Sequence, residues 1–64
     1  MRTAIVIQNA VKSVGAAEAI SNGWPAACGE LSVFLKSESE RRRFVSLCRQ
    51  GGAADFPLNL RLVP

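Results

Sequence analysis

The hydrophobic residues of this chain follow two spacings, one typical of strands and one typical of helices. The run Ile5-Val6-Ile7 is consecutive and β-branched, which predicts a buried strand over residues 3–9. Hydrophobic and polar residues alternate over 30–36 and again over 57–63. Because side chains on a strand point to opposite faces in turn, this alternation predicts two further strands, each with one buried face.

Residues 13–20 have the spacing of a short amphipathic helix. Hydrophobic residues recur there at every third position, Ser13 is a candidate N-cap, and the Asn-Gly pair at 22–23 follows. That pair is typical of a C-terminal stop. Gly15 would weaken the interior of such a helix by about 1 kcal/mol relative to alanine. The pattern therefore predicts a short and weak first helix.

The second predicted helix begins after Ser37 and ends before the glycine pair at 51–52. Ser37 and Glu40 have the Ser-x-x-Glu spacing of a capping box, in which each side chain satisfies a backbone N–H of the first turn. A hydrophobic stripe follows from Phe44 to Cys48. The glycines provide the positive φ with which many helices end. This is the most clearly marked element of the sequence.

These elements predict a single α/β or α+β domain over residues 1–64 with the order β-α-β-α-β. Each connection between strands is long enough for a helix, so parallel neighbours with right-handed crossovers are expected. An antiparallel final strand is the structural alternative. Two crossovers of one hand place both helices on one face of a three-stranded sheet. The opposite face would then present Ser32, Phe34, Lys36, Asn59, Arg61, Val63 and part of the Ile5 and Ile7 set.

A parallel sheet is rarely left open on one side, so we expect a partner to cover this second face. The chain has 64 residues, and a domain of that size buries only about 60% of the surface that its unfolded form exposes. Its core is expected to supply roughly 3–5 kcal/mol. A second copy of the chain, forming a homodimer through the open sheet face, is one candidate for the cover.

Composition excludes several classes of protein. Hydrophobic residues make up 48% of the chain, too many for intrinsic disorder. There are two cysteines, Cys28 and Cys48, and no histidine, which is too few ligands for a tetrahedral zinc site. Polar Gln8 and Asn9 end the first hydrophobic run before it reaches the length of a signal-peptide core or a membrane span. We therefore expect a cytoplasmic protein with free thiols, no metal or other cofactor and no membrane contact.

Catalytic chemistry is not expected. The chain lacks histidine and tyrosine, and histidine is the commonest general acid or base. Lys12-Ser13 lacks the glycines with which a phosphate-binding loop wraps its ligand. Cys48 falls at the C-terminal pole of its predicted helix, where a thiolate is disfavoured. Cys28 is the remaining candidate nucleophile, with no base nearby in the sequence, and it is the basis of the enzymatic alternative.

Arginine is the main source of the net charge of +3. The triplet Arg41-Arg42-Arg43 follows two glutamates, and the spacing predicts the ion pairs Glu38–Arg42 and Glu40–Arg43. Arg42 and Arg49 are seven residues apart, so they share one helix face. A nucleic-acid-binding domain that places Arg41, Arg42, Arg43 and Arg49 on phosphates is the alternative function, although aromatic stacking residues are scarce.

The interpretation that these observations favour is a non-catalytic protein-binding module. Such a module would act as a small regulator or inhibitor, in the manner of bacterial and phage accessory proteins, by docking onto a larger protein with an acidic surface. Tryptophan and arginine are enriched among residues that dominate binding energy at interfaces. The predicted partner-binding residues are Trp24, Phe34, Arg42, Arg49, Arg61 and Val63.

Overall fold

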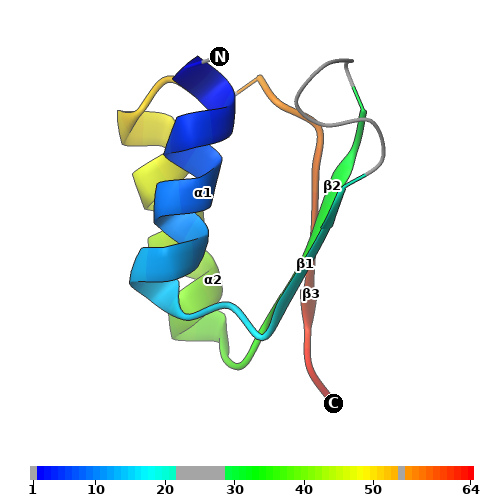
Figure 1. The fold of residues 1–64 in the computed structure, drawn as a ribbon. Coiled ribbons are helices and arrows are strands. Elements are labelled where there is room, and N and C mark those ends of the chain that lie inside the picture. The colour runs from blue at the N-terminus through cyan, green and yellow to red at the C-terminus, as the bar shows by residue number, and fades with distance from the viewer. Residues whose placement is uncertain (1, 22–28, 54) are drawn as a thin grey trace.

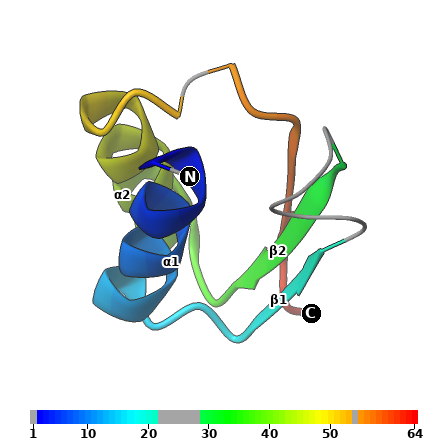
Figure 2. The same ribbon diagram turned by 45° about the horizontal axis from the view of Figure 1, so that its top comes forward.

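The computed structural model describes residues 2–21, 29–53 and 55–64. Its elements are, in chain order, α1 (Arg2–Val14), β1 (Glu18–Ser21), β2 (Leu31–Leu35), α2 (Glu38–Gln50) and β3 (Leu58–Leu62). The three strands form one sheet in the order β1-β2-β3, in which β1 is antiparallel and β3 parallel to β2. The two helices run antiparallel to each other and cover the same face of the sheet (Figures 1 and 2).

The predicted fold class is confirmed: this is a small α+β fold with a three-stranded sheet and two helices on one face. The parallel pairing of the final strand is also confirmed. The prediction of the first two elements is wrong. Residues 3–9 lie in α1 rather than in a strand, residues 18–21 form β1 rather than the end of a helix, and β1 precedes β2 directly.

The run Ile5-Val6-Ile7 lies inside α1 because the buried positions of this segment have helical spacing. Its buried residues are Ala4, Ile7, Ala10 and Val14, whereas Ile5 is 58% exposed. In a strand Ile5 and Ile7 would share one face. Residues three and four apart share a helix face instead, and α1 buries that face against α2 and the sheet.

Gly15 ends α1 and is not inside a helix. Its φ of +70° is the left-handed conformation that glycine adopts at little cost after the last helical residue. The Gly15 N–H donates to the Val11 carbonyl at 3.0 Å, and the Ala16 N–H donates to the same oxygen at 3.3 Å. The chain then turns toward β1, and just before that strand the Ala17 N–H donates to the Phe34 carbonyl at 2.8 Å.

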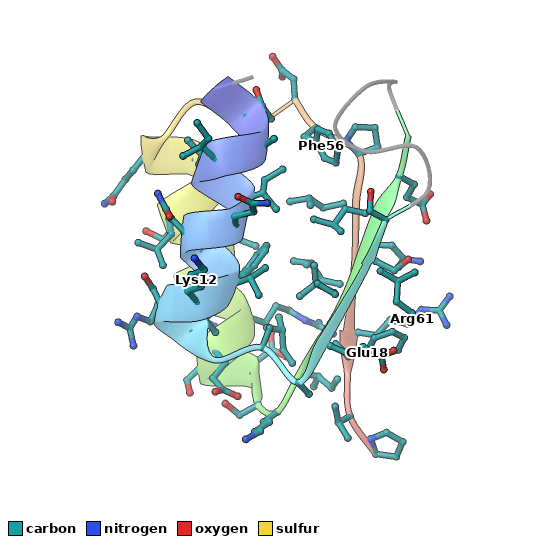
Figure 3. The ribbon with its side chains drawn as sticks, in the orientation of Figure 1. Lys12, Glu18, Phe56 and Arg61 are labelled. Carbon is teal, nitrogen blue, oxygen red and sulfur yellow. The ribbon has the colours of Figure 1, made fainter. Side chains whose placement is uncertain are left out.

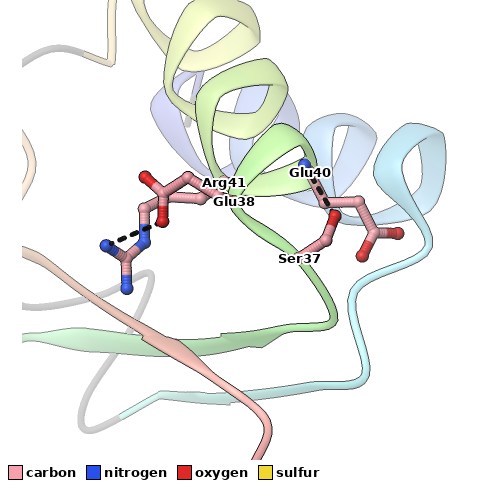
Figure 4. A network of polar contacts seen from close by, with 4 residues as sticks. All are labelled: Ser37, Glu38, Glu40 and Arg41. Carbon is pink, nitrogen blue, oxygen red and sulfur yellow. Dashed lines mark hydrogen bonds and ion pairs between the residues drawn. The ribbon is translucent and has the colours of Figure 1, made fainter.

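The N-cap predicted for α2 is confirmed (Figure 4). Ser37 has extended backbone angles, and its hydroxyl accepts a hydrogen bond from the Glu40 N–H at 3.2 Å. The carboxylate of Glu40 accepts the Lys36 N–H at 3.0 Å, one residue earlier than the reciprocal bond of a capping box. At the other end Gly51 keeps right-handed angles, and Gly52 takes the positive φ of +87°.

The hydrophobic core lies between the helix pair and the sheet. Ile7 of α1, Val33 and Leu35 of β2, and Phe44 of α2 are each 0% exposed. Cys48 is 2% exposed, which confirms its predicted place in the core. Among the described residues no buried residue is polar, so the core between the helices and the sheet is hydrophobic.

Candidate functional site

The side of the sheet opposite the helices carries a regular arrangement of side chains. Along β2, Leu31, Val33 and Leu35 are buried toward the helices, so the alternate residues Ser32 and Phe34 point the other way. We call this side the outer face. By strand register it consists of two rows of three residues: Glu18, Phe34 and Arg61, and then Ile20, Ser32 and Asn59.

The first row places an aromatic ring between opposite charges. Glu18 of β1 pairs with Phe34, and Phe34 pairs with Arg61 of β3. Glu18 and Arg61 are exposed and Phe34 is half-buried. Since neighbouring strands are about 4.8 Å apart, the backbones of the two charged residues lie about 10 Å from each other across the sheet. Figure 3 shows both on the side of the sheet away from the helices.

The second row is less charged. Ile20 is 46% exposed and is a diagonal neighbour of Phe34, close enough for their side chains to touch. At the other edge the Asn59 side-chain amide donates to the Glu30 carboxylate at 3.4 Å. The outer face therefore has a hydrophobic centre of Phe34 and Ile20, and neither helix covers it (Figures 1 and 2).

The residues predicted to bind a partner are divided between two surfaces. Phe34 and Arg61 lie together on the outer face. Val63 follows β3, with its N–H donating to the Leu35 carbonyl at 2.8 Å and its side chain 43% exposed. Arg42 and Arg49 lie on α2, on the other side of the sheet. Trp24 lies outside the described residues.

The arginines of α2 form a second surface. Arg41, Arg42 and Arg49 line one shallow hollow of about 400 Å³ together with Val45, Ser46 and Gln50. Arg43, predicted to act with them, is exposed but does not line this hollow. Within the described residues the ion pair of this segment joins Arg41 Nη1 to Glu38 Oε2 at 3.5 Å (Figure 4). It replaces the predicted Glu38–Arg42 and Glu40–Arg43 pairs.

A groove of about 240 Å³ separates α2 from β3. Its walls include Val45, Phe56, Leu58 and Leu60, and Cys48 lies among them. Burial raises the pKa of the Cys48 thiol, so the neutral form is favoured there. This placement supports a structural role for Cys48. Cys28, the other candidate nucleophile, lies outside the described residues.

Lys12 and Ser13 both lie in the last turn of α1 and are exposed; Figure 3 shows Lys12 on this helix. The sequence pattern placed a helix N-terminus here, with Ser13 as its N-cap. The structure places a helix C-terminus at this point, and that end carries the negative pole of the helix dipole. The prediction of Ser13 as an N-cap is therefore wrong.

Sequence reasoning missed Glu18 and Ile20, because it assigned both to a helix. Their places on the outer face follow from the antiparallel register with β2. Within the described residues no group of three or more potential metal ligands is gathered. In the same residues no helix has the length and hydrophobicity to cross a membrane.

Protein-family models, curated protein sequences and solved structures were compared with the chain, and none of them matches it. Its function must therefore be argued from its own residues.

Proposed function

We propose that this chain is a non-catalytic protein-binding module, a small regulator or inhibitor that docks onto a larger protein through its outer face. The observation that supports this proposal is the first row of that face, in which the half-buried Phe34 lies between exposed Glu18 and Arg61. An aromatic centre with a polar rim is the usual anatomy of a protein interface.

The physical argument begins with the two sides of the sheet. The helix side buries Leu31, Val33 and Leu35 to within 1% of full burial. On the outer face, in contrast, Ile20 is 46% exposed, and Phe34 is only half-buried. Covering hydrophobic area gains about 25 cal/mol per Å². A docking partner would thus provide the second layer that the described chain itself does not place on this face.

The proposal includes a non-catalytic role in the cytoplasm. Cys48 is a free thiol that is buried, and burial raises its pKa, opposite to the shift that activates a nucleophilic cysteine. A free cysteine is compatible with a reducing compartment. The interface with the partner should contain a carboxylate opposite Arg61, because an arginine beside a carboxylate forms a charge-assisted pair.

The experiment is affinity capture from a lysate of the organism that encodes the chain. The wild-type chain, Phe34→Asp and Arg61→Glu would be compared as baits at low micromolar concentration, with nuclease-treated and untreated arms. We expect at least one protein to be retained by the wild type after nuclease treatment and to be lost with both variants. A charge at the centre of a hydrophobic interface leaves an unpaired group buried in the complex.

The matched control is the double variant Arg42→Glu/Arg49→Glu, which alters the helix surface and leaves the outer face intact. It should retain the same protein as the wild type. Circular dichroism must first show that every bait is folded. Equal retention by the wild type and by folded Phe34→Asp would exclude the outer face as the docking surface.

Nucleic-acid binding is the second candidate function, and one observation favours it. Arg41, Arg42 and Arg49 are brought to the same hollow on α2, although the Glu38 carboxylate partly neutralises Arg41. Arginine side chains suit phosphate because their planar fork can donate two parallel hydrogen bonds. Such binding would have a strong salt dependence, since each neutralised phosphate releases counterions.

This candidate is tested by fluorescence anisotropy of labelled duplex and single-stranded oligonucleotides at low and moderate salt. If the hollow binds phosphates, Arg42→Glu/Arg49→Glu should abolish the signal. The control is Lys12→Glu/Arg61→Glu. It lowers the net charge by the same amount, but its two positions lie away from the α2 hollow (Figure 3). Equal loss with both double variants would indicate a response to net charge and no specific arginine site.

A further inference from the structure

We infer that a second copy of this chain covers the outer face when no other partner is bound. This inference rests on the proposed function, because it uses the same docking surface. It goes further by naming one molecule that binds there, the chain itself. The supporting observation is that the charges of the first row are complementary to the same row in a second copy. Self-association and docking of a larger partner would then exclude each other.

The complementarity follows from the strand order. Glu18 is on the edge strand β1, Phe34 on the central strand β2 and Arg61 on the edge strand β3. When two such faces meet about a two-fold axis that runs along β2, strand β1 of each copy lies over strand β3 of the other. Glu18 of each copy then faces Arg61 of the other, and Phe34 faces its own equivalent. A two-fold interface requires this kind of self-complementary surface.

The centre of the interface would be hydrophobic. Phe34 lies on the axis, and Ile20, a residue that is 46% exposed, lies diagonally beside it. Two copies would therefore gather two phenylalanine and two isoleucine side chains between two symmetric ion pairs. Aromatic pairs at such a centre contribute about 0.5–1.5 kcal/mol beyond the area that they bury.

Strand geometry limits how strong this dimer can be. Three short strands cover on the order of 250 Å² of face, about a third of the 800 Å² per partner that stable complexes bury. The axis also brings Glu30 near its own copy, and Lys36 near its own, at the two exposed ends of β2. We therefore expect a weak dimer, with a dissociation constant on the order of 100 µM or higher.

An axis across the strands would give a different pairing. In that arrangement each edge strand would face its own equivalent, so that Glu18 would lie on the same side as Glu18 of the second copy. Like charges that face each other at an interface are strongly unfavourable. The row Glu18–Phe34–Arg61 thus selects the axis along β2 over the axis across it, and this choice can be tested by exchanging charges.

The test uses the purified chain alone, by sedimentation velocity between about 10 µM and about 1 mM, the range that brackets the expected affinity. We expect concentration-dependent dimer formation by the wild type. Glu18→Arg places two arginines opposite each other, and Arg61→Glu places two glutamates opposite each other. Each variant should weaken the dimer at least about tenfold, because facing opposite charges become like charges.

The decisive arm is a one-to-one mixture of the two variants. A Glu18→Arg chain has arginine at both ends of the row, and an Arg61→Glu chain has glutamate at both ends. Their heterodimer again places opposite charges in contact at both positions, so the mixture should associate more strongly than either variant alone. Recovery on mixing would not come from a general attraction between oppositely charged chains, because both variants keep a positive net charge: the wild-type +3 rises by two with Glu18→Arg and falls by two with Arg61→Glu.

Two results would overturn the inference. One is a wild type that stays monomeric over the whole concentration range while both variants are folded by circular dichroism. The other is a wild-type dimer that neither charge variant weakens, since another surface would then form it. Neither result bears on the capture experiment, which is done at concentrations where the copies are apart. A failure of docking to a larger protein and a failure of self-association are thus distinguishable.

Discussion

Gly51, at the end of α2, lies directly against the side chain of Val6, near the beginning of α1. A Cβ atom built on Gly51 would lie 2.7 Å from Val6 Cγ2 and 3.1 Å from Val6 Cβ, and still closer to Val6 Cγ1. The φ of Gly51 is −86°, which any residue can adopt. Glycine is therefore required at this position for space rather than for backbone freedom, and the close approach of the two helices depends on it.

Replacing Gly51 with alanine should destabilise the fold by about 1–3 kcal/mol, the usual cost of inserting an extra methyl group into a packed contact. Urea denaturation monitored by circular dichroism would measure this change. In a Val6→Ala background, the Gly51→Ala substitution should cost less, because the methyl groups that it meets are gone. The control is Gly52→Ala, where nothing lies within 4 Å. Its cost of about 1–2 kcal/mol comes from positive φ and should not depend on residue 6.

Ile5 and Ile7 distinguish the helix from the strand that the sequence pattern predicts. Ile5 is 58% exposed and Ile7 is 0% exposed. We expect Ile7→Ala to cost about 2–5 kcal/mol, as for other buried isoleucines, and Ile5→Ala to change stability by no more than about 0.5 kcal/mol. Thermal and urea denaturation would show the difference. Equal costs at both positions would contradict the helix, since a strand places the two on one face.

Ser37 fixes the beginning of α2 through its hydroxyl. Ser37→Ala removes the acceptor for the Glu40 N–H, and we expect a loss of about 1 kcal/mol in the free energy of unfolding. Ser39→Ala is the matched control: it removes the hydrogen bond between the Ser37 and Ser39 hydroxyls at 3.1 Å, which Ser37→Ala also removes, and it leaves the Ser37 acceptor for the Glu40 N–H in place. A difference between the two variants of less than a few tenths of a kcal/mol would show that the cap contributes little.

The Cys48 thiol should make stability depend on alkaline pH. Burial raises its pKa in the folded chain above the ordinary value of 9.0. Below that pH the thiol is protonated in both states and has no effect. Above it the unfolded chain releases the proton and the folded chain keeps it, so stability falls by at most about 1.4 kcal/mol per pH unit. Denaturation from pH 7 to 10.5 should show this decline in a Cys28→Ser chain, where no other thiol titrates. A decline of the same size after the further change Cys48→Ala would rule out the thiol as its source.

The sequence was sufficient for the second half of the fold. Alternation identifies β2 and β3, and the Ser37 cap with the glycine pair at 51–52 gives the bounds of α2. These signals agree with one another locally, so no tertiary information is needed. From alternation alone, Phe34 and Arg61 could be placed on the face opposite the helices.

The first 21 residues were misassigned because two patterns overlap in them. The β-branched run Ile5-Val6-Ile7 favours a strand by composition, while Ala4, Ile7, Ala10 and Val14 have helical spacing. Alanine gives a weak hydrophobic signal, and packing against α2 decided the outcome. Gly15, placed just after Val14, was the available sign of a helix end. Glu18 and Ile20 could not be found on the outer face, since only their pairing with β2 places them there.

The parallel pairing of β2 with β3 has a consequence for the folding chain. Leu31 of β2 meets Leu58 of β3, and all of α2 is synthesised between them. While the chain folds, β1 and β2 can pair directly, whereas β3 reaches β2 only after α2 has crossed over the sheet. Until β3 docks, β2 has one unpaired edge, and unpaired edges are templates for wrong pairing with other chains. The order in which the strands join therefore sets how long a folding chain is open to intermolecular pairing, and the docking of β3 ends that interval.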